Sequence, residues 1–250
     1  MPQETLFISD LHLRPTRPAI TRQLLDFLAV RARRAEALYI LGDLFDTWVG
    51  DDDPSPPGRK VQAALKSLRD SGTAIYFQHG NRDFLIGKRF LEESGLRLLE
   101  DYSVIDLYGS RTLLMHGDLL CSDDLPYLEF RKKARSPEWQ NAVLSKPLWL
   151  RLAYARWYRL RSYFHKRNKS EEIMDANPQT VEAVMQNYQV SRLIHGHTHR
   201  PAEHRIEING TVARRIVLAR WEGGGSVLVV NEQGYRIESV AGVQRPARPS

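Results

Sequence analysis

Cysteine is almost missing from this chain of 250 residues, which contains only Cys121. A single cysteine excludes a disulfide framework and a cysteine-rich zinc site. The first residues lack the basic and apolar regions of a secretory signal peptide. No apolar run approaches the ~18 residues that a membrane-spanning helix needs. We therefore expect a cytoplasmic protein that does not span a membrane.

The rest of the composition is that of an ordinary globular protein, with 42% hydrophobic and 26% charged residues. The length suits one large α/β domain or two small ones. Lys and Arg number 36 against 30 Asp and Glu, so the net charge is +6. This excess favours an anionic partner, which could be a nucleic acid, a phosphorylated small molecule or an anionic membrane surface.

Short apolar runs alternate with helical patterns in the first half of the chain. Residues 6–8, 38–41 and 74–77 read as buried strands, with helical periodicity over 19–34 and 61–69 between them. This order predicts a parallel sheet with right-handed crossovers. Further strands are predicted at 96–99, 104–107, 112–115, 191–194, 203–208, 215–219, 226–230 and 235–240. We expect residues 1–250 to form one α/β (α+β) domain, with a helical insertion at about 124–170 in a helical middle that runs to 188.

Polar motifs follow five of these strands at their carboxyl ends, where open α/β sheets bind ligands. They are Asp10-Leu11-His12, Gly42-Asp43-Leu44-Phe45-Asp46, Gly80-Asn81-Arg82-Asp83, His116-Gly117-Asp118 and His195-Gly196-His197-Thr198-His199. A lone Asp-x-His is common and a Gly-Asp pair after a strand is usually just a turn, whereas His-Gly-His-x-His is rarer. Five in order, offering carboxylate, amide and imidazole groups but no thiolate, favour Mn²⁺, Fe²⁺ or Zn²⁺.

The series D-x-H, G-D-x-x-D, G-N-x-D, H-G-D and G-H-T-H resembles the calcineurin-like metallophosphoesterase superfamily across residues 10–199. The resemblance implies two packed mixed β-sheets flanked by helices, in a four-layer sandwich that holds two metal ions bridged by an aspartate. It assigns one ion to Asp10, His12, Asp43 and His197, and the other to Asp43, Asn81, His116 and His195. We expect the catalytic residues to be Asp43, Asn81, Arg82 and His116.

One motif departs from the superfamily, because Arg82 stands where a histidine usually follows the asparagine. Arginine cannot act as a general acid at neutral pH, although it can hold a phosphate with two hydrogen bonds. This favours a substrate with a good leaving group, such as one phosphate of a pyrophosphate. A pair of metal ions suits this chemistry, since it activates water and neutralises phosphoryl charge.

Acidic residues are absent from Lys146–Lys169, which we call the basic aromatic segment. It contains eight Lys and Arg and six aromatic residues. The rest of the chain therefore has a net charge of −2. On a helix its apolar residues share one face, with Arg151 and Arg159 opposite. The face could pack on the core, or it could lie near a membrane or hold an acyl chain. Nucleic-acid binding is a third interpretation, which so apolar a stripe disfavours.

Together, the G-N-R-D motif and the insertion are similar to a subfamily that hydrolyses UDP-2,3-diacylglucosamine to UMP and 2,3-diacylglucosamine 1-phosphate in lipid A biosynthesis. That similarity implies two Mn²⁺ ions and peripheral attachment to the cytoplasmic side of the inner membrane. The insertion would be a cap whose acyl-chain groove contains Trp149, Trp157, Leu160 and Phe164. The implied substrate contacts are Asn81, Arg82, Asp124, Ser162, Lys166, Lys169 and His195, with Asn168 as an alternative to Lys166.

The expected partners are thus a UDP-linked diacyl glucosamine lipid and an anionic membrane surface. We expect no nucleic acid and infer no protein partner. Two alternatives remain open at this point. One is another metallophosphoesterase, such as a nucleotide pyrophosphatase or phosphodiesterase, and the other is a metal-binding scaffold without catalysis.

Overall fold

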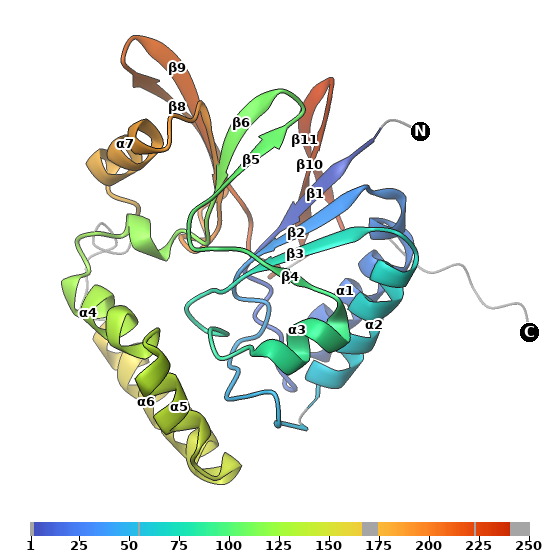
Figure 1. The fold of residues 1–250 in the computed structure, drawn as a ribbon, viewed down its shortest axis with the longest axis vertical. Helices are drawn as coiled ribbons and strands as arrows, with labels where there is room; N and C mark the ends of the chain where they lie inside the picture. The colour runs from blue at the N-terminus through green and yellow to red at the C-terminus, as the bar shows by residue number, and fades with distance from the viewer. Residues whose placement is uncertain (1–2, 55, 167–174, 223, 241–250) are drawn as a thin grey trace, which may run out of the picture.

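The computed structural model describes residues 3–54, 56–166, 175–222 and 224–240, with only the backbone described over 160–166. Its strands form two mixed sheets (Figure 1). The six-stranded sheet has the order β11-β10-β1-β2-β3-β4, with β1 (Thr5–Ile8), β2 (Ala37–Leu41), β3 (Ala74–Gln78), β4 (Arg97–Leu98), β10 (Ser226–Asn231) and β11 (Gly234–Ser239). The five-stranded sheet has the order β5-β6-β7-β9-β8, with β5 (Ser103–Leu107), β6 (Ser110–Leu114), β7 (Arg192–His195), β8 (Ala202–Ile208) and β9 (Thr211–Val217).

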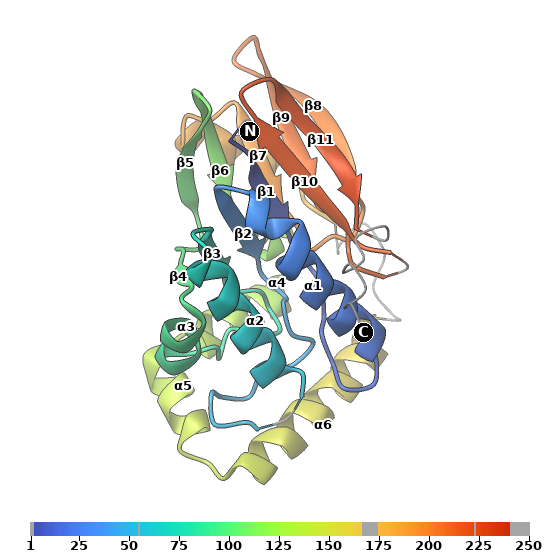
Figure 2. The same ribbon diagram turned by 90° about the vertical axis from the view of Figure 1, so that its right-hand side faces the viewer.

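Helices cover the outer face of each sheet, which gives four layers (Figures 1 and 2). The six-stranded sheet is covered by α1 (Pro18–Val30), α2 (Gly58–Asp70) and α3 (Lys88–Ser94), and the five-stranded sheet by α7 (Pro178–Asn187). Strand β1 shows how the sequence fills these layers. Leu6 and Ile8 pack among the helices, whereas Phe7 points into the core between the sheets, because successive side chains of a strand alternate between its faces. The predicted two-sheet fold is therefore confirmed.

The strands β1, β2 and β3 are parallel, as the sequence predicted. In the other sheet β6, β7 and β9 are also parallel, for which the sequence analysis made no prediction. The Asn209-Gly210 pair joins β8 to β9 with φ angles of 50° and 73°, which is what a tight type I′ hairpin turn requires. All these parallel strands end at the same side of the sandwich.

Two predicted elements are shorter in the structure. The helix expected over 19–34 ends at Val30 and continues as a 3-10 turn over Ala32–Arg34, a change of winding that apolar periodicity does not reveal. The strand expected over 96–99 pairs with β3 only through Arg97 and Leu98. Another 3-10 turn, Asp118–Leu120, follows β6.

Of the helices between β6 and β7, three lie together beside the sheets, at the lower left of Figure 1. We call α4 (Leu125–Ala134), α5 (Pro137–Leu144) and α6 (Leu148–Lys166) the cap helices. Side chains fix where the first two begin, because Asp124 accepts a hydrogen bond from the Tyr127 backbone and Ser136 accepts one from Trp139. Within the described residues, no helix is both long and apolar enough to cross a membrane.

The aromatic face of α6 points into solvent. Trp149 is 69% exposed and Trp157 is 52% exposed. The interpretation that this face packs on the core is therefore wrong for these two side chains. Arg151 on the opposite face is buried instead. The side chains of Leu160 and Phe164 lie outside the described part of the structure.

Candidate metal centre

Loops from both sheets meet at the carboxyl ends of the parallel strands. Their backbone is unusual, because several candidate ligands have the left-handed φ angles that residues other than glycine rarely adopt. Among the described residues these are Asp10 at 54°, His12 at 47°, Asp43 at 53°, His197 at 68° and His199 at 56°. Such strained residues concentrate at functional sites, where the surrounding fold holds them in place.

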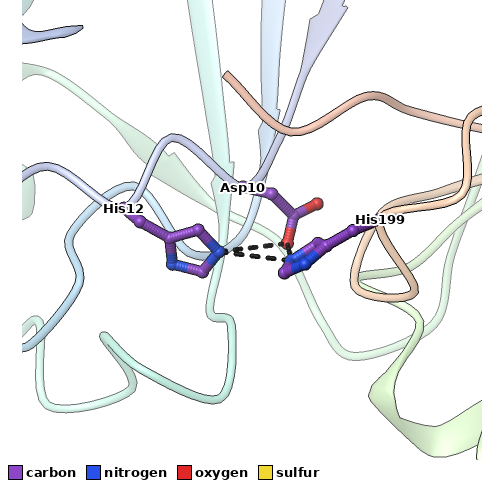
Figure 3. A group of neighbouring side chains, drawn as sticks. All are labelled: Asp10, His12 and His199. Atoms are coloured by element: carbon purple, nitrogen blue, oxygen red, sulfur yellow. Dashed lines mark hydrogen bonds and ion pairs between the residues drawn. The ribbon is translucent and has the colours of Figure 1, made fainter. Parts of the chain in front are cut away.

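Asp10, His12 and His199 form the first group of potential ligands (Figure 3). Nε2 of His199 lies 3.1 Å from Oδ1 of Asp10 and 3.2 Å from Nε2 of His12. The other oxygen of Asp10 accepts hydrogen bonds from the Ser9 hydroxyl at 2.6 Å and the His197 backbone at 2.9 Å. These bonds fix the carboxylate so that Oδ1 faces the two imidazoles, as outer partners do in metal sites.

The second group consists of the buried residues Asp10, Asp43 and His116, so Asp10 belongs to both groups. The side-chain oxygen of Asn81 lies 3.1 Å from Nε2 of His116 and 3.1 Å from Nδ1 of His197. Nδ1 of His116 donates to the carbonyl oxygen of Leu41 at 2.9 Å. That bond orients the ring and leaves Nε2 facing the group.

Asp43 lies between His12 of the first group and His116 of the second. Its Oδ2 lies 3.7 Å from Nδ1 of His12, and its Oδ1 lies 3.8 Å from Nε2 of His116. Burial raises the pKa of Asp43 to about 7, against the effect of His116 and with a contribution from the nearby carboxylate of Asp83. A cation beside this carboxylate would offset the cost of burying its charge.

The pKa shifts of Asp10 and His12 fit a cation as well. Burial raises the pKa of Asp10, but the hydrogen bond from His199 and the surrounding imidazoles outweigh it and hold that pKa below its ordinary value. Burial lowers the pKa of His12 to about 2, so this ring is neutral at physiological pH. Its Nδ1 is buried and has no hydrogen-bond partner among the described residues. Unpaired polar atoms of this kind need an explanation, and the donor set of carboxylate, imidazole and amide groups suits two divalent cations.

His195 does not join either group, although the sequence analysis expected it to be a ligand. Its Nε2 accepts a hydrogen bond from Nε of Arg215 at 2.8 Å, and its Nδ1 donates to the carbonyl oxygen of Gly196 at 2.8 Å. Burial and the charge of Arg215 lower its pKa to about 3. Both ring nitrogens are therefore engaged, and the structure places His199 with Asp10 instead.

The sequence did not separate His195 from His199, because the predicted strand 191–194 ends before all three histidines. In the structure His195 is the last residue of β7 and pairs with Val217, whereas the other candidate ligands stand beyond the ends of their strands. The extra residue of β7 therefore places His197 and His199, and not His195, in the loop that reaches the site.

Asp83 holds together the loops that carry Asn81 and Asp43, a role that the sequence analysis did not assign. Its carboxylate accepts hydrogen bonds from the Gly80 backbone at 2.9 Å and from the Leu44 backbone at 2.7 Å. The loops approach so closely that a Cβ on Gly80 would lie 2.1 Å from Oδ1 of Asp43. Only glycine fits this position.

The structure describes only some of the predicted substrate residues with their side chains. Arg82 lies at the site, where its backbone N–H donates to Oδ1 of Asp43 at 2.9 Å. Asp124 caps α4, the cap helix that follows the site. Ser162 and Lys166 fall in α6 where only the backbone is described, and Asn168 and Lys169 lie outside the described residues.

Two contacts connect α4 to the metal centre. Asp118, two residues after His116, is buried and accepts a hydrogen bond from Nε of Arg131 at 2.6 Å. The hydroxyl of Tyr127 donates to the same carboxylate, and its ring stacks near that of His197, with centroids 6.4 Å apart. The cap therefore begins in direct contact with the residues around the metal groups.

This fold with its two ligand groups is that of a metallophosphoesterase, and residues 4–201 match the calcineurin-like phosphoesterase family. The chain belongs to that family. Curated relatives named UDP-2,3-diacylglucosamine hydrolase include one from Enterobacter sp. (strain 638), 52% identical, and one from Salmonella typhi, 54% identical. Each match covers 93% of this chain and 97% of the relative. Among solved structures, an archaeal phosphodiesterase is 12% identical with a TM-score of 0.47, covering 95% of this chain and 99% of its own.

Proposed function

We propose that this protein hydrolyses the pyrophosphate of UDP-2,3-diacylglucosamine to UMP and 2,3-diacylglucosamine 1-phosphate in lipid A biosynthesis. The observation that carries the proposal is the similarity to UDP-2,3-diacylglucosamine hydrolases over 97% of their length, which spans the cap as well as the metal centre. The two groups of ligands share Asp10, and Asp43 lies between His12 and His116. Such a pair of neighbouring sites suits the cleavage of a phosphoric anhydride.

The residues would hold two divalent ions, which we propose to be Mn²⁺. One ion would be held by Asp10, His12 and His199, and the other by Asn81, His116 and His197. Both ions would contact Asp43. The ions would activate water and neutralise charge on the phosphoryl oxygens. His199 takes the place that the sequence analysis gave to His195. Nε2 of His195 already accepts a hydrogen bond from Arg215.

Arg82 would bind the pyrophosphate directly. Its backbone is fixed by the bond to Asp43, so its guanidinium starts from a defined point beside the metal groups. Guanidinium groups match phosphate oxygens with paired hydrogen bonds. We retain Asn81 as a further contact to the phosphate, and Asp124, Ser162, Lys166 or Asn168, and Lys169 as contacts to the rest of the substrate.

The cap would bring the enzyme to its lipid substrate at the cytoplasmic side of the inner membrane. The exposed face of α6 carries Trp149, Leu150, Tyr154 and Trp157, and the basic aromatic segment contains eight positive charges. Apolar side chains flanked by cations are typical of elements that lie on anionic bilayers. Trp149, Trp157, Leu160 and Phe164 remain our proposal for an acyl-chain groove.

The activity is tested by mixing purified protein with UDP-2,3-diacylglucosamine in detergent micelles and measuring UMP release. We expect hydrolysis that is lost on metal chelation, returns with Mn²⁺ and is abolished in Asp43→Ala. Faster cleavage of a soluble UDP-sugar than of the lipid would indicate a nucleotide pyrophosphatase instead. Bound metal near zero in the active protein would contradict the two-ion site.

Association with membranes is tested separately by flotation on vesicles. We expect the protein to float with phosphatidylglycerol vesicles and less with phosphatidylcholine vesicles, and the double variant Trp149→Ser/Trp157→Ser to float poorly. Substituting Trp221, which is buried in the core, would unfold the protein and makes no useful control. The exposed Ile237→Ser on β11 provides one, and equal flotation of both variants would refute the role of the cap.

A further inference from the structure

Three arginines from separate parts of the chain gather around the buried carboxylate of Asp46, three residues after Asp43. Arg159 of α6 lies 2.5 Å from its Oδ2, and Arg14 of the loop after β1 lies 3.6 Å from the same oxygen. Arg82 of the loop after β3 lies 3.8 Å from Oδ1. Arg159 also donates to the Thr47 hydroxyl at 2.8 Å. We call Asp46 and these three arginines the Asp46 cluster.

The charges of the Asp46 cluster do not balance. Three guanidinium groups face one carboxylate, which leaves a net charge of +2 beside the metal groups. The carboxylate has only 7% of its side chain exposed, whereas the side chain of Arg82 is 29% exposed and that of Arg159 is 38% exposed. Each guanidinium has five N–H donors in a fixed plane, so one aspartate cannot use all of them. Among the contacts of the described residues, donors therefore remain for a ligand that carries negative charge.

The pyrophosphate of a nucleotide-linked sugar carries two negative charges, which matches this excess. We propose that Asp46 is a positioning residue, whose carboxylate holds Arg82 and the cap residue Arg159 together as one binding site for the substrate pyrophosphate. The inference rests on the proposed function and extends it, because it makes a cap arginine part of phosphate recognition. The cluster supplies binding and orientation, and the metal groups supply the activated water.

A simpler role for Arg159 would be to anchor the cap, and a second arginine of α6 separates the two explanations. Arg151 donates to both oxygens of Asp52 and to the carbonyl oxygen of Val49. Its side chain is only 4% exposed, so it attaches the same helix to the loop after β2 without facing solvent. Loss of Arg151 would weaken the attachment of the cap but leave the Asp46 cluster intact.

The test compares Arg159→Gln with Arg151→Gln and with Arg156→Gln, an exposed arginine of the same helix. With UDP-2,3-diacylglucosamine in micelles, we expect Arg159→Gln to raise KM by about 10- to 100-fold, the range for losing a hydrogen bond to a charged group. Metal content and melting temperature should stay near those of the wild type. Arg156→Gln and Arg151→Gln should change KM by less than about threefold.

Asp46→Asn tests the positioning role itself, because it keeps the shape of the side chain and removes its charge. We expect it to raise KM, and to raise it less in an Arg159→Gln background than in the wild type, since the two residues act together. Independent, multiplicative effects would refute the positioning role. Equal KM values in Arg159→Gln and Arg151→Gln, or in Arg159→Gln and Arg156→Gln, would refute the pyrophosphate site while leaving the proposed function in place. No hydrolysis by the wild type would refute the proposed function.

Discussion

His195, at the end of β7, and His199, four residues further on, provide the sharpest test of the metal centre, because the structure gives them opposite roles. His199 faces Asp10 and His12 with Nε2 3.1 Å from the carboxylate. His195 is fully buried and bonded to Arg215. We expect His199→Ala to lose metal while remaining folded, and His195→Ala to lose stability while keeping its metal.

The sizes of the two effects follow from these surroundings. The side chain of His199 is 33% exposed, so its removal leaves little cavity, but loss of a ligand should weaken metal binding by more than the 10- to 100-fold that an outer partner costs. Removing His195 leaves the buried guanidinium of Arg215 without its acceptor, which costs about 1.5–3 kcal/mol, and adds a cavity. A total of about 3 kcal/mol lowers the melting temperature by roughly 6–12 °C in a chain of this size.

Both variants would be dialysed against limiting Mn²⁺, then measured for bound metal by mass spectrometry and for unfolding by calorimetry. His204→Ala is a matched control, since His204 is exposed on β8, and it should change neither quantity. If His195→Ala lost bound metal at an unchanged melting temperature and His199→Ala retained it, the geometry derived for the site would be wrong.

Three further predictions concern the surroundings of the site. Gly80→Ala should reduce hydrolysis at least about 100-fold, because its Cβ would lie 2.1 Å from Oδ1 of Asp43, and a rate near that of the wild type would contradict so close an approach. Arg151→Gln should speed amide hydrogen exchange in α6 without changing exchange in the sheets, and equal exchange in wild type and variant would show that this arginine is no anchor. Burial alone would raise the pKa of Asp118, but His116 and Arg131 outweigh it and hold that pKa below its ordinary value of 3.8. Its ionised form therefore stabilises the fold above about pH 4, and this contribution should disappear as the pH falls further. Urea titrations of wild type and Asp118→Asn should therefore converge at low pH, and a constant difference would contradict the prediction.

Much of the fold could be predicted from the sequence because the signals were local. Apolar runs separated by helical periodicity define β1, β2 and β3, and the chirality of crossovers makes them parallel. Their carboxyl ends then share one edge, so Asp10, Asp43 and Asn81 had to lie near one another. The Asn209-Gly210 turn likewise depends only on two adjacent residues.

The parts that could not be predicted depend on tertiary contacts. Three histidines at 195, 197 and 199 offer the same chemistry. Only the position of Arg215 shows that His195 is engaged in a hydrogen bond. Periodicity grouped the aromatic residues of α6 on one face but could not say that the face with Arg151 turns inward. The Asp46 cluster joins segments far apart in the sequence, so no spacing within a motif could indicate it.

The separation of the ligands along the chain has a consequence for how the protein matures. Asp10 and His199 touch although they are 189 positions apart in the sequence, and the two groups draw on loops of both sheets. No fragment synthesised before residue 199 contains the complete set, so tight metal binding has to follow the packing of the sheets. Because an ion that binds only the folded state stabilises it, metal binding would raise the stability of the protein after the sheets have packed. A shortage of metal during growth would then appear as a shorter lifetime of the protein in the cell, in addition to a lower rate of catalysis.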